Sequence, residues 1–264
     1  MRAPVKSTAW GTLPAMSPAE LPDQPGAREP AAASEHAATR QPAALVTGSA
    51  RRLGRHLAER LIGLGWLVVI HATEDARAEA AAAELGAAGH VGGDLRDLAA
   101  CDALVDAAVA QLGGELDLLV NNAGSFVLAT PQQTTPQDWA EAFDVNARAP
   151  LFLAMRAAPT LAARRGLIVN ISDHAAHEHW GTRAVHSASK AALESLTLSC
   201  AKALAPDVRV NGICPGPVLP PDDADAELLA QLERRGGIGT PEQVSDVLLQ
   251  LIASPARTGE IVVL

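Results

Sequence analysis

The 264-residue sequence contains no tyrosine and only 3% aromatic residues, so proton transfer at a catalytic site cannot use a phenol. Its three cysteines, Cys101, Cys200 and Cys214, are widely spaced and odd in number. This pattern indicates neither a disulfide framework nor a cysteine-rich zinc site, and it suits a reducing compartment. No apolar run approaches roughly 18 residues, and the N-terminus lacks the apolar stretch of a signal peptide. We therefore expect a cytoplasmic protein without a membrane span.

Basic residues are also in the minority. The 21 Lys and Arg stand against 30 Asp and Glu, which gives a formal net charge of −9, and they form no continuous block. A basic footprint of the kind that binds phosphate backbones is therefore missing, which argues against nucleic acid as the main partner. The 48% of hydrophobic residues is enough to build the core of a globular domain. A small-molecule substrate fits this composition.

Residues 1–41 differ in texture from the rest of the chain. They are rich in Pro, Ala, Ser and Glu, without sustained apolar periodicity, and six prolines from Pro4 to Pro30 interrupt any regular element. We predict a flexible N-terminal extension over 1–41 and one folded domain over 42–264.

From Ala43 onward, short apolar segments alternate with longer amphipathic or alanine-rich segments. Strands are predicted at 43–47, 66–71, 88–92, 116–121, 166–171, 208–213 and 260–264. Helices are predicted from about residue 53, and at 76–85, 99–112, 136–164 with a break near Pro150, 187–204 and 241–253. Several strands are apolar on both faces, which is typical of a parallel sheet covered by helices on both sides. The sequence thus predicts an α/β fold with a single doubly wound, Rossmann-type domain.

The first predicted strand runs directly into Thr47-Gly48-Ser49-Ala50-Arg51-Arg52-Leu53-Gly54. A glycine-rich turn at this junction lets the backbone approach a pyrophosphate, and the following helix N-terminus offers N–H groups to it. Two glycines six residues apart also fit a tight turn without a ligand. The position at the first strand-to-helix junction of an alternating chain favours a dinucleotide.

The same segment resembles the TGxxxGxG turn of the short-chain dehydrogenase/reductase family, with Arg52 at the middle glycine. Further resemblances follow in order at Asp94-Leu95, Asn121-Asn122-Ala123-Gly124, Asn146 and Pro215-Gly216-Pro217-Val218, and together they extend over residues 43–264. The resemblance implies an NAD(P) cofactor. The cofactor-binding residues it implies are Gly48, Arg51, Arg52, Leu53, Gly54, Thr73, Asp94, Leu95, Asn122, Ala123, Gly124, Lys190, Pro215, Gly216 and Val218.

The end of the second predicted strand bears on the choice between NADP and NAD. An acid there would bind the ribose hydroxyls of NAD and repel the extra phosphate of NADP, but the aligned residue is Ala72. Arg51 supplies a cation and Thr73 a hydroxyl for a 2′-phosphate. Glu74 counts against NADP unless its side chain points outward. We expect NADPH, with NADH as the alternative.

The resemblance also reaches the catalytic residues. In the family a Ser or Asp precedes the catalytic Tyr by thirteen residues and a Lys follows it by four, and these positions here are Asp173, His186 and Lys190. Lys190 shares a helix face with His186, so its ammonium disfavours an imidazolium, whereas pairing with Asp173 favours one. The resemblance assigns Asn146 to the same catalytic set, where it holds a water relay. The competing interpretations are a cap for Asp173 and a surface residue of an inactive relative for His186.

Several departures from the common family pattern match its pteridine reductase branch. Arg52, Asp173 in place of Ser, and Phe126 after the NNAG segment occupy positions that contact a pterin there. A flat substrate benefits from an aromatic face, although Phe126 would also fit a hydrophobic core. The substrate-binding residues implied are Arg52, Phe126, Asp173, His179, Trp180 and His186.

The segment His174-Ala175-Ala176-His177-Glu178-His179-Trp180 gathers three histidines and a glutamate. Because the family places a substrate-facing loop here, we predict pocket residues and no metal.

The resemblance further implies a homodimer or homotetramer through the helix 187–204. Family members continue past a strand like Ile261–Leu264 into a further turn, so contacts from such a tail are in doubt.

Three functions remain open from the sequence. The first is an NADPH-dependent reductase of a pteridine-like ring, with Asp173, His186 and Lys190 handling the proton. The second is a reductase of another carbonyl substrate, with His186 as the donor to an oxyanion. The third is a catalytically silent NAD(P)-binding protein, which the absence of tyrosine supports.

Overall fold

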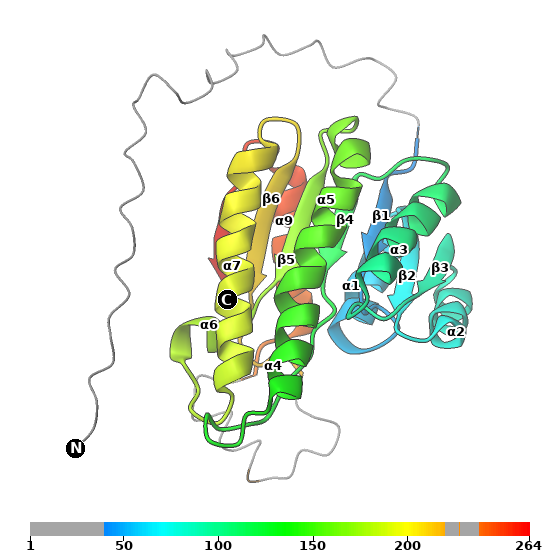
Figure 1. The fold of residues 1–264 in the computed structure, drawn as a ribbon. Coiled ribbons are helices and arrows are strands. Elements are labelled where there is room, and N and C mark those ends of the chain that lie inside the picture. The colour runs from blue at the N-terminus through cyan, green and yellow to red at the C-terminus, as the bar shows by residue number, and fades with distance from the viewer. Residues whose placement is uncertain (1–39, 220–226, 228–237) are drawn as a thin grey trace, which may run out of the picture. The chain divides into compact units, whose positions relative to one another are not determined.

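Parallel strands form one seven-stranded sheet in the order β3-β2-β1-β4-β5-β6-β7 (Figure 1). The computed structural model describes residues 40–219, 227 and 238–264, so the predicted extension over 1–41 lies outside them apart from its last two residues. The strands are β1 (Ala43–Val46), β2 (Leu67–Ala72), β3 (Gly89–Gly92), β4 (Leu118–Asn121), β5 (Leu167–Ile171), β6 (Arg209–Cys214) and β7 (Ile261–Val263). Because all pairs are parallel, every strand ends at the same edge of the sheet.

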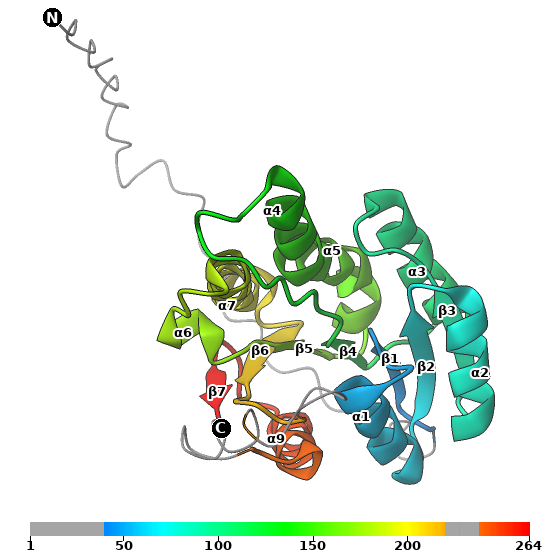
Figure 2. The same ribbon diagram turned by 90° about the horizontal axis from the view of Figure 1, so that it is seen from below.

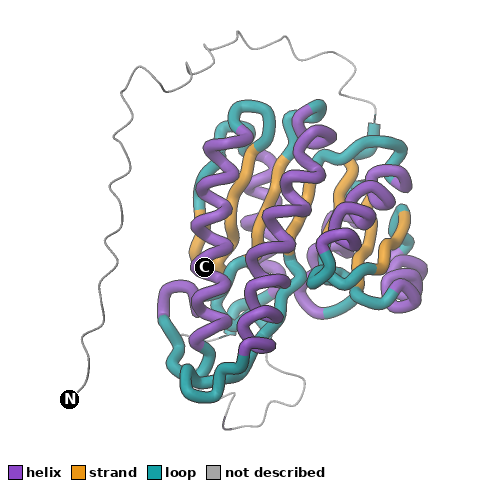
Figure 3. The backbone as a smooth tube through the Cα atoms, in the orientation of Figure 1, coloured by secondary structure: helices purple, strands orange, loops and turns teal. Residues whose placement is uncertain are grey.

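Helices cover both faces of this sheet, as Figures 2 and 3 show. One apolar cluster packs α3 (Leu98–Gln111), α5 (Ala149–Ala162) and α7 (Ala184–Leu204) on one face. A second cluster packs α1 (Arg52–Gly63), α2 (Asp75–Leu85) and α9 (Pro241–Ala253) on the other. Strands β1, β4 and β5 contribute to both clusters, which explains their apolar residues on both sides. The predicted doubly wound α/β fold is confirmed.

Two elements differ from the sequence prediction. The predicted break in the helix over 136–164 is a π-helical segment at Asp144–Arg148, between α4 (Pro136–Phe143) and α5. Pro150 lies in the first turn of α5, directly after the π-helical segment, and its missing N–H removes one bond from the continuous helical backbone there. A short helix, α6 (Ala175–Glu178), occupies part of the loop predicted to face the substrate. Hydrophobic periodicity cannot reveal the extra residue in a π-helical turn, and it cannot reveal a helix of a single turn such as α6.

Buried polar side chains connect β4, β5 and α7 inside the apolar layer. Asn121 donates from Nδ2 to Oδ1 of Asn170 at 2.8 Å, and Asn170 donates from Nδ2 to the Thr197 hydroxyl at 2.8 Å. Thr197 in turn donates to the carbonyl of Leu193 at 2.7 Å. Because buried polar groups are costly when they lack partners, this chain fixes how α7 sits on the sheet. Among the described residues, none of the helices has the length and apolarity needed to span a bilayer.

Replacing Asn170 by alanine should lower the free energy of unfolding by about 1–3 kcal/mol, because Asn121 and Thr197 then lose a buried partner. Urea unfolding followed by circular dichroism measures this loss. Ser199→Ala is the control, since that hydroxyl lies on the exposed side of α7 and bonds only within the helix, and we expect a change within about 0.5 kcal/mol. Equal losses of unfolding free energy in the two variants would contradict the role given to the buried hydrogen bonds of Asn170.

Candidate active site

A cleft of about 680 Å³ opens at the carboxyl edge of the sheet, where β1, β4 and β5 end. Most of the residues predicted from the sequence meet there, although they come from segments that are distant along the chain. Those lining the cleft are Gly48, Arg51, Arg52, Leu53, Gly54, Thr73, Asp94, Leu95, Asn122, Ala123, Gly124, Phe126, Asp173, His186 and Lys190.

Other predicted residues lie elsewhere. Pro215, Gly216 and Val218 line a neighbouring cavity of about 480 Å³, together with His174. Neither cavity is lined by His179, which is exposed at the end of α6, or by Trp180, whose indole N–H donates to the carboxylate of Glu178. The structure therefore does not bring His179 and Trp180 to the described part of the cleft.

The turn between β1 and α1 is held by hydrogen bonds across the sheet edge. The Thr47 hydroxyl accepts from the backbone N–H groups of Asn122 and Ala123, each at 3.0 Å. Asn122 donates from Nδ2 to the carbonyls of Thr47 and Gly48, at 2.9 and 3.1 Å. A Cβ on Gly54 would lie 2.3 Å from the Gly48 oxygen, so only glycine permits this approach. A glycine cradle beside the N-terminus of α1, opening onto the cleft, suits a dinucleotide pyrophosphate.

Arg52 begins α1 with a φ of 51°, in the left-handed region that favours glycine. The turn therefore keeps a glycine-like backbone with a charged side chain on it, at a cost of about 1–3 kcal/mol. The Arg52 guanidinium lines the cleft and donates to the carbonyl of Leu219 at 2.9 Å. Strain of this kind persists at functional sites, where the side chain has a use.

His71 is a residue of this turn that the sequence analysis did not identify. Its Nδ1 accepts from the N–H of Gly48 at 3.0 Å, so its Nε2 carries the proton and donates to the carbonyl of Gly93 at 3.1 Å. Burial lowers the pKa of His71, in agreement with a neutral ring. The imidazole thus joins β2 to both the first and the third strand-to-helix connections.

The end of the cleft beside β2 is cationic and polar. Of the described residues there, Arg51, Thr73 and Arg77 line the cleft, whereas Glu74 does not. The Glu74 side chain is 71% exposed and lies 3.6 Å from Arg77. Asp94 accepts hydrogen bonds from Arg96, which lower the pKa of its carboxyl group.

At the opposite end, Asn146 projects from the π-helical segment and is fully buried. Its Oδ1 accepts from the N–H of Ser125 at 2.8 Å, and its Nδ2 donates to the Ser125 carbonyl at 2.9 Å. The same Nδ2 donates to the Ser189 hydroxyl, which donates to the His186 carbonyl. Asn146 therefore fixes the backbone of Ser125 against α7, directly beside His186.

The ring of His186 is held in one orientation. It is 2% exposed, and its Nδ1 lies 3.1 Å from the Ser125 carbonyl, which can only accept, so Nδ1 carries a proton. Its Nε2 is buried, has no hydrogen-bond partner in the described residues, and lies 3.6 Å from Oδ2 of Asp173. That separation is longer than a hydrogen bond but short enough for an ion pair. The interpretation of His186 as a surface residue is therefore wrong.

Asp173 has two roles in the structure. Its Oδ1 accepts from the N–H of Ala175 at 2.8 Å, in the first turn of α6, while its Oδ2 faces His186. Burial raises the pKa of Asp173, but the contact with His186, the bond from Ala175 and the charge of Lys190 together bring it below its usual value. The carboxylate is therefore ionised at neutral pH.

Lys190 is buried behind Asp173 and donates from Nζ to the carbonyl of Ile171 at 2.8 Å. Burial lowers the pKa of its ammonium group, which the charge of Asp173 opposes. A Cβ on Gly124 would lie 3.6 Å from the Lys190 nitrogen and 3.3 Å from Oδ1 of Asn146, so glycine keeps this end of the cleft open.

Phe126 forms a wall of the cleft beside His186. It is 49% exposed, and its ring meets the imidazole edge-on at a centroid distance of 4.6 Å. The Arg183 guanidinium carbon lies 4.4 Å from the Phe126 ring centre and 5.0 Å from that of Trp180. The alternative of a core position for Phe126 is wrong, since half of its surface remains available to a ligand.

Gly54→Ala should weaken dinucleotide binding by at least about tenfold, because the methyl group would displace the Gly48 carbonyl and the Asn122 amide from the cradle. Quenching or enhancement of NADPH fluorescence measures the affinity. Gly63→Ala is a matched control in the same helix, since no atom lies within 4 Å of its added Cβ. Unchanged affinity in both variants would contradict the assignment of the cradle.

Known proteins identify the family. Residues 42–228 match the family model described as short chain dehydrogenase. The chain is 37% identical over 179 residues to galactitol 2-dehydrogenase of Agrobacterium fabrum, covering 66% of this chain and 70% of that protein. It is 34% identical to pteridine reductase 1 of Leishmania tarentolae, covering 82% and 91%. A short-chain alcohol dehydrogenase structure from Sinorhizobium meliloti superposes with a TM-score of 0.77 at 27% identity, covering 84% and 94%. The chain belongs to the short-chain dehydrogenase/reductase family and is an NAD(P)H-dependent oxidoreductase.

Proposed function

We propose that the protein is an NADPH-dependent reductase of a pteridine-like ring, in which His186 supplies the proton. The observation that carries this proposal is the orientation of the His186 ring, with Nδ1 on the Ser125 carbonyl and Nε2 toward Asp173 at the cleft. NADPH, when bound, supplies the hydride. The residues of the chain then have to deliver one proton to the substrate.

The tautomer determines which proton is available. Because Nδ1–H is fixed by the Ser125 carbonyl, the neutral ring has a bare Nε2, and only the imidazolium carries a proton there. Giving up that proton leaves a stable neutral ring with Nδ1–H unchanged. An imidazolium is a far better acid than a neutral imidazole, so the transfer does not require an imidazolate anion to form. The Asp173 carboxylate lies 3.6 Å from Nε2, and Asn146 keeps the acceptor carbonyl in place.

A nitrogen heterocycle suits this set of groups. The ionised Asp173 can accept a hydrogen bond from a ring or amino N–H of a bound substrate. The exposed face of Phe126 offers a flat ring an aromatic surface, and Arg52 brings a cation to the cleft from the turn beside α1. Similarity to a pteridine reductase over most of both chains supports the same substrate class.

The charges beside β2 favour NADPH over NADH. Arg51, Arg77 and the Thr73 hydroxyl can bind a 2′-phosphate, whereas the buried Ala72 offers no carboxylate to ribose hydroxyls. Glu74, which would repel the phosphate, is 71% exposed and does not line the cleft, although its carboxylate lies 3.6 Å from Arg77. These are surface charges in a cleft, so we expect the preference for NADPH to weaken as ionic strength rises.

A homodimer or homotetramer and a cytoplasmic location remain predictions. Apolar side chains exposed on two neighbouring helices support an oligomer: Phe152 and Met155 on α5 and Leu198 on α7. The charge balance of the chain supports neither a nucleic acid nor a membrane surface as partner.

The rate of NADPH oxidation with dihydrobiopterin should rise as the pH falls, when measured between about pH 8 and pH 5. The lowered pKa of Asp173 keeps that carboxylate ionised across this interval, so the rise does not come from Asp173. His186→Ala should lose about 10²–10⁴-fold in kcat and the pH dependence with it. Asp173→Asn keeps the cap on Ala175 but removes the anion 3.6 Å from Nε2 of His186, so it should also lose kcat.

His186→Tyr distinguishes two causes of low activity, the lack of a proton donor and a cleft closed to substrate. If the cleft is intact, a phenol beside Lys190 should give turnover equal to or above that of the wild type. A flat pH profile with full activity in His186→Ala would exclude His186 as the donor. NADPH binding without turnover of either pterins or a panel of ketones would instead favour a silent cofactor-binding protein.

Phe126→Ala should raise KM for the pterin by about two- to tenfold, which is the range expected for loss of one aromatic contact. A small aliphatic ketone, which gains little from a flat aromatic face, should be affected much less. Phe152→Ala is the control, since that ring is also partly exposed but lies on α5 and does not line the cleft. Equal effects on pterin and ketone would favour a carbonyl reductase.

A further inference from the structure

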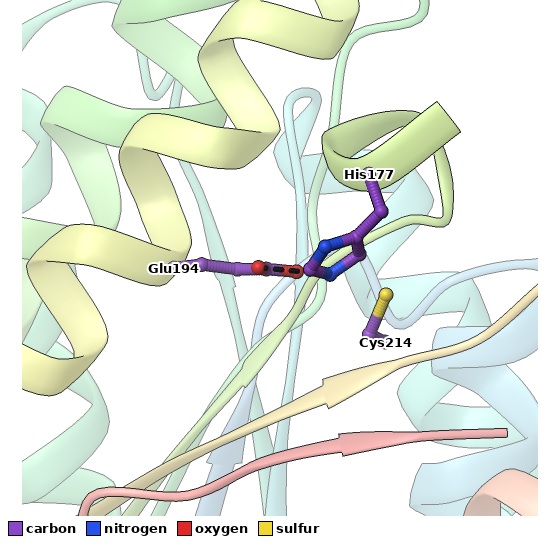
Figure 4. Close-up of side chains that lie close together, drawn as sticks. All are labelled: His177, Glu194 and Cys214. Atoms are coloured by element: carbon purple, nitrogen blue, oxygen red, sulfur yellow. Dashed lines mark ion pairs between the residues drawn. The ribbon is translucent and has the colours of Figure 1, made fainter. Parts of the chain in front are cut away.

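Three side chains of different chemistry meet at a point that the proposed mechanism does not use. His177 lies on α6, Glu194 on α7, and Cys214 is the last residue of β6 (Figure 4). One donor atom from each lies within 4.8 Å of the other two. Nε2 of His177 and Oε2 of Glu194 are 3.1 Å apart, and Figure 4 shows the Cys214 sulfur beside the imidazole.

The spacing fits a small cation with four ligands. Zinc binds imidazole nitrogen, carboxylate oxygen and thiolate sulfur at about 2.0–2.3 Å, which puts tetrahedral donors about 3.3–3.8 Å apart. The 3.1 Å between His177 and Glu194 is close to that spacing, and the Cys214 sulfur lies within 4.8 Å of a donor atom of each, so side-chain rotation has to bring the sulfur closer. The Glu194 side chain is only 12% exposed and Cys214 is fully buried, so this is not a solvated group of surface acids.

A hydrogen bond to its other oxygen also orients the Glu194 carboxylate. The Ser172 hydroxyl donates to Oε1 of Glu194 at 2.6 Å, which leaves Oε2 directed toward His177. Outer partners of this kind fix the ligands of metal sites and raise their affinity. The remaining side is open, because the His177 side chain is 52% exposed.

We infer that His177, Glu194 and Cys214 bind one divalent transition-metal ion of the zinc class, with a fourth position open to solvent beside His177. Binding breaks the S–H bond of Cys214, forms a metal–sulfur bond and releases one proton to solvent. Burial, together with the charge of Glu194, raises the pKa of the free thiol to about 12, so the metal must displace that proton.

The charges balance when the ion is bound. One thiolate and one carboxylate neutralise a dication, so the bound site carries no net charge. The ion would connect α6, α7 and the end of β6; α7 also carries His186, and Asp173 caps α6 through the N–H of Ala175. The sequence predicted no metal, since of the histidine-rich segment only His177 takes part and its partners are distant along the chain.

Cobalt(II) is the probe that tests this site in the full-length protein after treatment with a chelator. We expect one Co²⁺ per chain, visible d–d bands of a tetrahedral site, and a thiolate-to-cobalt charge-transfer band in the near ultraviolet that Zn²⁺ abolishes. Cys214→Ser should lose the charge-transfer band. His177→Gln should lower cobalt affinity at least about tenfold, and Ser172→Ala by about 10–100-fold through Glu194.

Cys101→Ala and His179→Gln are matched controls, because one removes a buried thiol elsewhere and the other an exposed imidazole at the end of the same short helix. Both should keep the full spectrum. Absence of the charge-transfer band in the wild type, or its persistence in Cys214→Ser, would overturn the proposal. If Cys214→Ser fails to fold, the His177→Gln variant provides the test, because the His177 side chain is half exposed and its replacement should leave the fold intact. An unchanged cobalt affinity in His177→Gln would then overturn the proposal. None of these outcomes depends on the pteridine substrate.

Discussion

The carbonyl oxygen of Ser125 is the acceptor on which the candidate active site depends. It receives a hydrogen bond from Asn146, which also accepts from the N–H of Ser125, and so the backbone is held on both sides of the Ser125 Cα. His186 donates to that oxygen through Nδ1. A backbone carbonyl cannot donate, so the position of one peptide group decides which ring nitrogen exchanges its proton. The π-helical segment makes this possible, because it turns Asn146 inward; such segments recur at functional sites.

The sheet supplies the frame for this arrangement. Strands β1, β4 and β5 are adjacent and parallel, so Thr47, Asn122 and Asp173 follow three strand ends at one edge. Thr47 and Asn122 satisfy one another's backbone groups and need no water there. The Asn121–Asn170–Thr197 chain one layer deeper then orients α7, which carries His186 and Lys190. Apolar packing alone would allow α7 to rotate or slide, whereas buried hydrogen bonds specify one position.

Much of the fold follows from the pattern of apolar residues, and the reasons for the exceptions are physical. Alternating apolar and amphipathic segments predicted all seven strands, and the signal is strongest in the central strands β1, β4 and β5, which are buried on both faces. The turn and catalytic residues that line the cleft could be named from motif spacing. His71 and Ser125 could not, since they act through a ring tautomer and a backbone carbonyl that no composition reveals. Trp180 was expected at the substrate, but the α6 turn and the bond to Glu178 hold it elsewhere.

In the proposed mechanism, histidine and aspartate at these positions depend on one another. A phenol becomes a useful acid near neutrality only when a cation lowers its pKa, which is the task of a lysine. An imidazole has the opposite requirement, because its proton-bearing form is a cation that a buried ammonium disfavours. Lys190 is buried beside this site, and Asp173 places an anion 3.6 Å from Nε2 of His186. Burial opposes ionisation of that carboxylate, but the contact with His186, the bond from Ala175 and the charge of Lys190 together lower its pKa. The N–H groups of Lys190 beyond the bond to Ile171 can bind a cofactor hydroxyl.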